Sequence, residues 1–135
     1  MKQVGFVGAF DKTDLIIYIA KILTVLGKRV LIADTTITQK AKYVVPALNP
    51  TLSYITEFEE IDIAVGFKNV EAIANYTNRS IETLEYDYLL LDIDSAESAM
   101  NFRIDRSVQN FFVTSFDTYD IRRGIEILNQ FQNPI

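Results

Sequence analysis

The start of the chain combines a short apolar strand with a longer apolar run of helical spacing. The strand covers Lys2–Gly8, and the run extends from Thr13 to Leu26 with polar or part-polar residues only at positions 14, 18, 21 and 24. Such spacing predicts a helix with one narrow wet stripe, so we expect most of its circumference to be buried. Gly27 should end this helix, because glycine readily adopts the left-handed backbone that follows a last turn.

The next two apolar runs are nearly continuous, which is typical of strands covered on both faces. They are Arg29–Ala33 and Tyr88–Ile93. The remaining pattern predicts, in chain order, a short helix within Thr38–Val45, strands at Leu52–Phe58 and Ile61–Phe67, helices near Asn69–Asn78 and Glu97–Phe102, a strand at Asn110–Ser115 and a helix at Thr118–Phe131. The strands between residues 52 and 67 fit either a hairpin or one strand with an irregular lead-in.

Two of these helices have an apolar face that points inward by its spacing. The expected inner residues are Val70, Ile73, Ala74 and Thr77 in the middle of the chain and Ile121, Ile125 and Leu128 in the last helix, which Asp117 can cap. Strands that alternate with helices predict an α/β fold, in which a parallel or mostly parallel sheet carries helices on both faces.

Length and composition narrow the class of protein. The chain has 135 residues, of which 49% are hydrophobic, and a net charge of −5. We expect one domain over residues 1–135 that does not bind DNA or an acidic membrane surface non-specifically. The lack of Cys and His excludes disulfides, thiol nucleophiles, His-based triads and imidazole metal sites. Without a cleavable signal or a membrane-spanning apolar run, we expect a cytoplasmic protein that a partner recruits to any membrane.

The loop between the first strand and the first helix, Gly8–Thr13, is the first candidate site. A strand, a tight loop and a helix place the helix N-terminus at the carboxyl edge of a sheet, where a phosphate can bind. Lys12 either neutralises such a phosphate or is a solvated lysine that pairs with Asp11 or Asp14. Thr13 either offers its hydroxyl to Mg²⁺ or is the helix N-cap.

Two residues of this loop change the expectation of a phosphate site. Asp11 precedes the lysine, where a phosphate loop needs a glycine whose backbone N–H turns toward the anion. A carboxylate about 4 Å from a phosphate oxygen costs about 4 kcal/mol per charge pair at an effective dielectric of about 20, which disfavours tight phosphate binding. Phe10 fills the phosphate cavity, projects outward as a contact, or packs on the first helix. We therefore predict Phe10 and Asp11 as interaction residues.

Carboxylates stand at the ends of the buried strands. Asp34 follows the second strand, and Asp92 lies in the strand Tyr88–Ile93. An ionised carboxylate survives there only if a cation or several N–H donors meet it. Without a nucleotide, we expect Asp34 and Asp92 to pair with Lys12 and to cap helix starts. Asp94 shares a face with Asp92, so the two gather a cation weakly, or Asp94 caps the next helix.

Four motifs give the chain a family resemblance. They are Lys12-Thr13, Gly27-Lys28-Arg29-Val30-Leu31-Ile32 followed by Asp34, Tyr86-Asp87-Tyr88-Leu89-Leu90-Leu91-Asp92, and Phe112–Phe116 followed by Ile121–Gly124. In this order and spacing they resemble the ParA/MinD-type ATPases, the deviant Walker A members of the SIMIBI class of P-loop proteins. The resemblance covers most of the chain and is weak between Ile37 and Leu84. It implies a P-loop NTPase-like fold with three layers.

The resemblance also implies a set of site residues. These are Gly8, Lys12 and Thr13 for ATP, Thr13 and Asp92 for Mg²⁺, and Asp34 as the catalytic residue that positions the attacking water. The chain departs from the family in the loop, where Val7 replaces its signature lysine and Ala9 and Asp11 replace glycines. Thr36 replaces a second aspartate after the second strand.

These departures predict a degenerate ParA/MinD-like pseudo-ATPase with weak or lost ATP hydrolysis and at most weak binding of ATP and Mg²⁺. The resemblance extends to the TadZ/CpaE-like branch, which carries such altered loops and is associated with pilus assembly and secretion machines. We therefore expect a scaffold, localisation or assembly factor that acts through protein partners, as a homodimer or as a component of such a machine.

Two other functions stay open at this point. The first is an active ATPase with an atypical loop, and the second is a receiver-like phosphoacceptor domain. The chain also ends earlier than ParA/MinD domains do, so we expect the N-terminal part of a larger protein or a shortened version of the fold.

Overall fold

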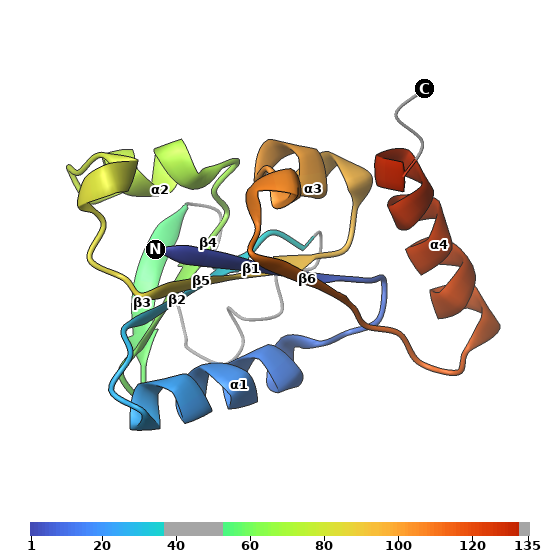
Figure 1. Cartoon of the computed structure of the whole chain (residues 1–135), viewed down its shortest axis with the longest axis horizontal. Coiled ribbons are helices and arrows are strands. Elements are labelled where there is room, and N and C mark those ends of the chain that lie inside the picture. The colour runs from blue at the N-terminus through green and yellow to red at the C-terminus, as the bar shows by residue number, and fades with distance from the viewer. Residues whose placement is uncertain (37–52, 133–135) are drawn as a thin grey trace.

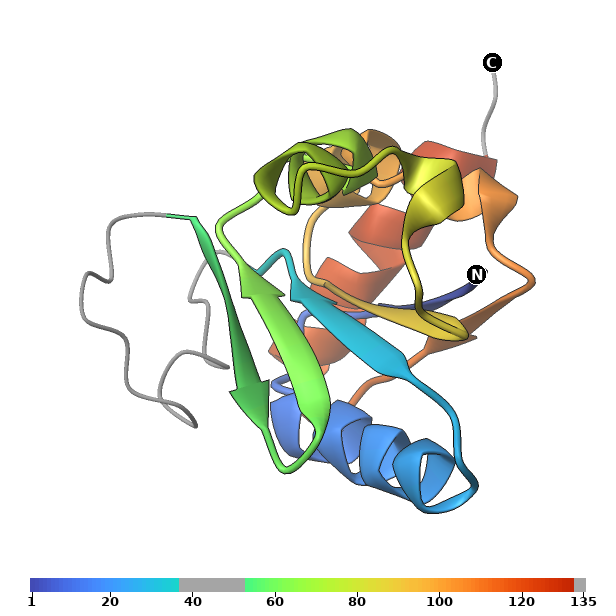
Figure 2. The same cartoon turned by 90° about the vertical axis from the view of Figure 1, so that its left-hand side faces the viewer.

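Six strands make one sheet in the part of the chain that the computed structural model describes, residues 1–36 and 53–132. They are β1 (Lys2–Val7), β2 (Val30–Asp34), β3 (Tyr54–Phe58), β4 (Ile61–Val65), β5 (Tyr88–Ile93) and β6 (Gln109–Phe112). Their order is β3-β4-β2-β5-β1-β6, and all neighbours are parallel except the antiparallel pair β3 and β4. The predicted α/β class with a mostly parallel sheet is confirmed. Of the two readings for residues 52–67, the hairpin is correct (Figure 2).

Helices connect these strands. They are α1 (Thr13–Val25), α2 (Val70–Tyr76), α3 (Ala96–Asn101) and α4 (Thr118–Gln132), with short 3-10 turns η2 (Ile81–Thr83) and η3 (Ile104–Arg106) that the sequence did not predict. Figure 1 shows α1 on one side of the sheet, α2 and α3 on the other, and α4 near its β6 end. The helix predicted within Thr38–Val45 lies outside the described residues.

The core consists of two apolar clusters, because alternate residues of a strand point to opposite faces. On the α1 side the cluster includes Val4, Phe6, Ile16, Ala20, Ile32 and Leu90. On the other side it includes Leu31, Ile73, Leu89, Leu91, Ala99 and Ile127. The central strands contribute to both clusters, which explains their nearly continuous apolar sequences.

The burial of α1 differs from the prediction. Its buried residues are Thr13, Ile16, Ile17 and Ala20, whereas five apolar residues are exposed: Leu15, Tyr18, Ile22, Val25 and Leu26. The prediction of a mostly buried circumference is wrong, because no other described helix lies on this side of the sheet to cover α1 (Figures 1 and 2). The end of the helix is as predicted: Gly27 has φ +83°, and the Lys28 N–H donates to the Leu23 carbonyl at 3.0 Å.

Helix α4 turns only part of its predicted face inward: Leu128 packs against the core as expected, whereas Ile125 does not. Asp117 caps it by accepting the Tyr119 N–H at 2.8 Å, as expected. Ile125 was expected to face inward but is 46% exposed, while Ile127 is 4% exposed. The reason lies in Gly124, where an added Cβ would lie 2.5 Å from the Phe112 ring. This close approach turns the Gly124 side of the helix toward the sheet and Ile125 outward.

The connections that leave the carboxyl ends of the neighbouring strands β1 and β5 run in opposite directions along the sheet. From β1 the chain runs through α1 to β2, on the far side of β5, whereas from β5 it runs through α3 to β6, on the far side of β1. Neighbouring strands whose connections leave in opposite directions form a switch point, and ligands of open α/β sheets bind in the crevice there. The strand order therefore places a crevice beside the loop that follows β1.

Candidate functional site

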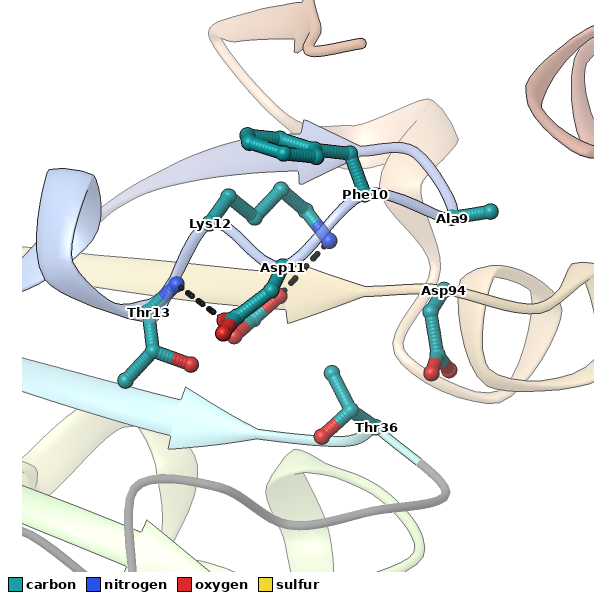
Figure 3. Close-up of a pocket in the computed structure, with 8 residues that line it drawn as sticks. Ala9, Phe10, Asp11, Lys12, Thr13, Thr36 and Asp94 are labelled. Atoms are coloured by element: carbon teal, nitrogen blue, oxygen red, sulfur yellow. Dashed lines mark hydrogen bonds and ion pairs between the residues drawn. The ribbon is translucent and has the colours of Figure 1, made fainter. Parts of the chain in front are cut away.

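A pocket of ≈ 180 Å³ occupies this crevice (Figure 3). Its lining residues come from the loop after β1, from the end of β2 and from the end of β5: Ala9, Phe10, Asp11, Lys12, Thr13, Thr36, Asp92 and Asp94. The structure thus brings most of the predicted site residues together. Thr36 joins them from the segment after β2, although the sequence pointed to it only as a replaced aspartate.

Lys12 lies inside the protein. Its side chain is buried, with the residue 2% exposed, and its Nζ lies 2.7 Å from Asp92 Oδ1 and donates to the Gly8 carbonyl at 2.9 Å. The alternative of a solvated lysine is therefore wrong, and the expected pairing with Asp92 is confirmed. Asp92 Oδ1 makes no well-directed hydrogen bond to a described residue, so the ammonium meets this oxygen as an ion pair.

Asp92 is a buried carboxylate with a raised pKa. Burial raises the pKa to about 6, the Lys12 ammonium opposes the rise, and the nearby Asp34 and Asp94 carboxylates add to it. A charge taken out of water is disfavoured unless the compensation is complete, and here the Lys12 ammonium offsets the desolvation of Asp92 only in part. Near neutral pH, a larger fraction of Asp92 is therefore protonated than of an ordinary aspartate.

Asp34 stands next to Asp92 on the neighbouring strand. The two residues are in register across β2 and β5. Asp34 is also buried, and its Oδ1 accepts the Thr36 N–H at 3.0 Å and the Thr36 hydroxyl at 2.5 Å. These donors compensate its burial, as carboxylates at strand ends require. Lys12 forms its ion pair with Asp92, and Asp34 makes this turn with Thr36.

Asp11 acts as an anion at the start of α1. Its Oδ1 accepts the Thr13 N–H at 3.2 Å (Figure 3). The N-cap residue is Lys12, whose side chain makes no capping bond, so the N-cap role predicted for Thr13 belongs to Lys12. A helix N-terminus attracts negative charge, and the Asp11 carboxylate already supplies it.

Gly8 has a structural role that the sequence did not reveal. A Cβ added to it would lie 1.9 Å from the carbonyl oxygen of Val113, just after β6. The Val113 N–H also donates to the Val7 carbonyl at 2.9 Å, which holds the two segments together. Glycine is thus required by the close approach of two backbones, whether or not a phosphate binds.

Phe10 and Asp94 frame the mouth of the pocket. Phe10 is 38% exposed, and Figure 3 shows its ring on the outer side of the loop, away from Thr36 and Asp94. The Asp94 carboxylate comes from the opposite wall, beyond the end of β5. The N-cap of the following helix α3 is Ser95, whose hydroxyl oxygen accepts the Ser98 N–H at 3.1 Å.

The pocket is small, and its described lining is mostly polar and acidic. Its ≈ 180 Å³ is below the roughly 300–1,000 Å³ of typical small-molecule sites. Among the described residues that line the pocket, Lys12 is the one cation, and its ammonium pairs with Asp92. Asp11, Asp92 and Asp94 add negative charge, which repels the phosphates of any nucleotide that approaches the pocket. Among the described residues, no group of three or more acidic side chains is placed to hold a metal.

Comparisons with known proteins add nothing to the ParA/MinD resemblance, which rests on the four sequence motifs alone. Within the described part of the chain, no helix combines the length and apolar character needed to cross a bilayer. No family model matches the chain, and no curated protein sequence matches it.

Proposed function

We propose that this chain is a degenerate ParA/MinD-like protein with a three-layer, P-loop NTPase-like fold that works as a scaffold or localisation factor through protein contacts. One observation carries the proposal: carboxylates of the chain itself, Asp11 in the loop and Asp92 in β5, occupy both positions that a phosphate would need. Asp11 accepts an N–H at the start of α1, and Asp92 holds the Lys12 ammonium.

Both contacts oppose a nucleotide. A phosphate at the helix start would meet the Asp11 carboxylate, and a repulsion of about 4 kcal/mol at about 4 Å is enough to remove most of a typical affinity. Recruiting Lys12 to that phosphate would leave Asp92 buried without its cation, which costs several kcal/mol more. Weak or absent ATP turnover follows from these two costs.

A role through protein contacts accords with the exposed residues around the pocket. Phe10 and Asp11 are exposed at its rim, where a partner can reach them. We propose cytoplasmic action within a larger assembly, such as a pilus or secretion apparatus, with any membrane contact made through the partner.

Titration calorimetry with ATP and Mg²⁺ tests this proposal. We expect no saturable binding by the natural sequence and a gain of at least about tenfold in affinity for Asp11→Gly, because the repelling charge is gone and the glycine is restored. Asp14→Gly is the matched control, since it removes the same charge one helical turn along and should bring no gain. Tight, Mg²⁺-dependent binding by the natural sequence would contradict the proposal.

An active ATPase with an atypical loop is the second candidate. It is favoured by the position of Lys12, Thr13 and Asp92 together in the crevice at the switch point. This candidate predicts Mg²⁺-dependent release of phosphate that Lys12→Ala abolishes. Asp34→Asn should abolish it as well, if Asp34 positions the attacking water.

A further inference from the structure

Helix α1 has two apolar faces on opposite sides. One face, with Ile16, Ile17 and Ala20, packs into the core. The other consists of Leu15, Tyr18, Ile22, Val25 and Leu26, which point to solvent; Tyr18 is 65% and Val25 85% exposed. We call these five residues the α1 outer stripe. A helix that is apolar on both sides is normally covered on both sides.

The spacing of the stripe indicates what covers it. Leu15, Tyr18, Ile22 and Val25 follow one another at intervals of three, four and three residues. Apolar residues at these intervals form the seam by which two helices pack side by side. The α1 outer stripe is therefore suited to another helix, in contrast to a strand or an extended peptide.

The charges beside the stripe select the partner. Asp14 and Lys21 are exposed on one flank of α1, since they are seven residues apart, and Lys28 is exposed just past the end of the helix. When two copies of α1 pack antiparallel, this flank of one meets the same flank of the other, and Asp14 approaches the partner's Lys28. Lys21 falls near the two-fold axis, where its pairing with Glu59 of its own chain at 2.5 Å limits repulsion.

We propose that two copies of this chain associate through their α1 outer stripes in an antiparallel, two-fold symmetric pair. The two-fold axis then crosses α1 at the height of residue 20. Antiparallel packing in this register places Leu15 on the partner's Val25 and Tyr18 on the partner's Ile22. A parallel pair would leave Asp14 and Lys28 without opposite charges. The surface is separate from the pocket, so the pair forms whether or not the loop binds a nucleotide.

Sedimentation velocity over a range of concentrations tests the association. A helix of 13 residues gives a small interface, so we expect a dissociation constant in the micromolar range, between roughly 1 and 100 µM. Ile22→Glu should weaken the pair at least about tenfold, because a charge then lies in the seam. Met100→Glu is the matched control: Met100 is 56% exposed on α3, across the sheet, and its substitution should leave the association unchanged.

Circular dichroism of both variants at low concentration separates a lost interface from a lost fold. A chain that stays monomeric at every concentration overturns the proposal, and so does a dimer that Ile22→Glu leaves intact. A stripe that binds only a helix from another protein also contradicts pairing between copies.

Engineered thiols test the direction of packing, which is possible because the chain contains no Cys. Mixing the Leu15→Cys and Val25→Cys variants under mild oxidation should give a disulfide between the two different chains. A parallel pair would instead link each variant to itself, and that result overturns the antiparallel arrangement. Asp14→Lys and Lys28→Asp should each weaken association, and the doubly substituted chain should recover it.

Discussion

At the scale of single residues, the ion pair between Lys12 and Asp92 dominates the site. Both side chains are buried, so each charge depends on the other for compensation. Breaking a buried pair by removing one member costs much more than the pair contributes as a whole. The geometry of the site therefore depends on two charged residues that are 80 positions apart in the sequence.

We expect Lys12→Met to lower the free energy of unfolding by about 3–5 kcal/mol at pH 8, because Asp92 is left charged and buried. The loss should be smaller at pH 5, where Asp92 takes up a proton. Urea unfolding at both pH values measures this. Lys21→Met is the control, since its pair with Glu59 is half exposed and worth at most about 1 kcal/mol. Equal effects of the two substitutions would contradict a buried pair.

The raised pKa of Asp92 predicts a pH dependence of stability. Its folded pKa of about 6 lies above the ordinary 3.8, so the folded chain binds this proton more tightly than the unfolded chain does. The resulting stabilisation is complete below pH 3.8 and disappears as the pH rises through about 6. It amounts to about 3 kcal/mol.

Unfolding curves between pH 4 and 7 should therefore differ between the natural chain and Asp92→Asn. Only the natural chain contains this titrating group, so the difference in unfolding free energy isolates it from all other carboxylates. A difference that does not change with pH would mean that the pKa of Asp92 is ordinary.

Gly8→Ala should lower the free energy of unfolding by about 3 kcal/mol or more, because the added Cβ meets the Val113 carbonyl at 1.9 Å and two backbones must separate. Gly27→Ala is a useful comparison. Its Cβ meets nothing within 4 Å, so only the left-handed backbone opposes it, at about 1 kcal/mol. Thermal unfolding of the two variants distinguishes the two costs, and a tolerated Gly8→Ala would contradict the close approach.

The sequence revealed the members of the site more readily than their contacts. Asp11, Lys12 and Asp92 were identifiable because they interrupt apolar runs or stand at strand ends. The role of Gly8 was hidden, since its neighbour Val113 is distant in the chain and only the β1–β6 pairing brings them together. The turn of Asp34 with Thr36 has a local signal, a carboxylate two residues before a hydroxyl, whereas the family resemblance implied a catalytic role for Asp34.

At the scale of elements, the β3–β4 hairpin stores backbone strain in its turn. Glu59 and Glu60, the two residues between the strands, have φ of 49° and 71°. Two-residue turns with both φ values positive match the twist of the strands and favour Asn-Gly. Glutamate accepts this backbone only at a cost, because its Cβ crowds the carbonyl in the left-handed region.

We expect Glu60→Gly to raise the free energy of unfolding by about 1 kcal/mol, since glycine removes the crowding in the turn. Glu57→Gly supplies the control within the same hairpin. Glu57 is exposed in the regular part of β3, where glycine should lower stability by about 0.5–1 kcal/mol. Opposite signs for the two substitutions in a urea titration would establish the strain, and a loss in both would disprove it.

Element positions and the inner face of α2, with Val70, Ile73 and Ala74 buried, followed from the sequence, whereas the faces of α1 and α4 followed only in part. Periodicity predicted α1 and its end at Gly27, because both depend on local backbone preferences. The same periodicity could not tell an apolar face that the sheet covers from one that faces solvent, which is why the outer stripe was misjudged. In α4 the face was set by Gly124 against Phe112, a contact between separate elements.

At the scale of the whole molecule, the sheet has a protected centre and open ends. Strand β5 lies between β2 and β1, and its residues Leu89, Leu90 and Leu91 are buried. Strand β6 lies at one end, and all four of its residues are exposed. Edge strands present backbone groups that no neighbour occupies, so their hydrogen bonds open more easily.

Hydrogen exchange followed by mass spectrometry should show this gradient. We expect the amides of Leu89–Leu91 to exchange most slowly, because they are exposed only when the whole fold opens. The amides of β6 should exchange much faster, through local opening of the edge strand. The comparison should hold at low and high protein concentration, since pairing through α1 leaves β6 uncovered. Equal protection of β5 and β6 would mean that something covers the edge.

The α/β class was predictable because strand-helix alternation is written in short segments of sequence. Strand order was not, since it depends on which distant segments pair, and it is the order that creates the crevice. The sequence identified the loop and the carboxylates Asp34, Asp92 and Asp94 as site residues, while the strand order that places β2 and β5 beside the loop required the structure.

The switch point between β1 and β5 has a consequence for the evolvability of this chain. Connectivity creates that crevice, so no substitution in the loop can erase it. A library randomised over the loop, selected on immobilised phosphorylated compounds, would start from a helix terminus and strand ends that already converge. A few substitutions in the loop are then enough to produce a binding site, while the strand order stays the same.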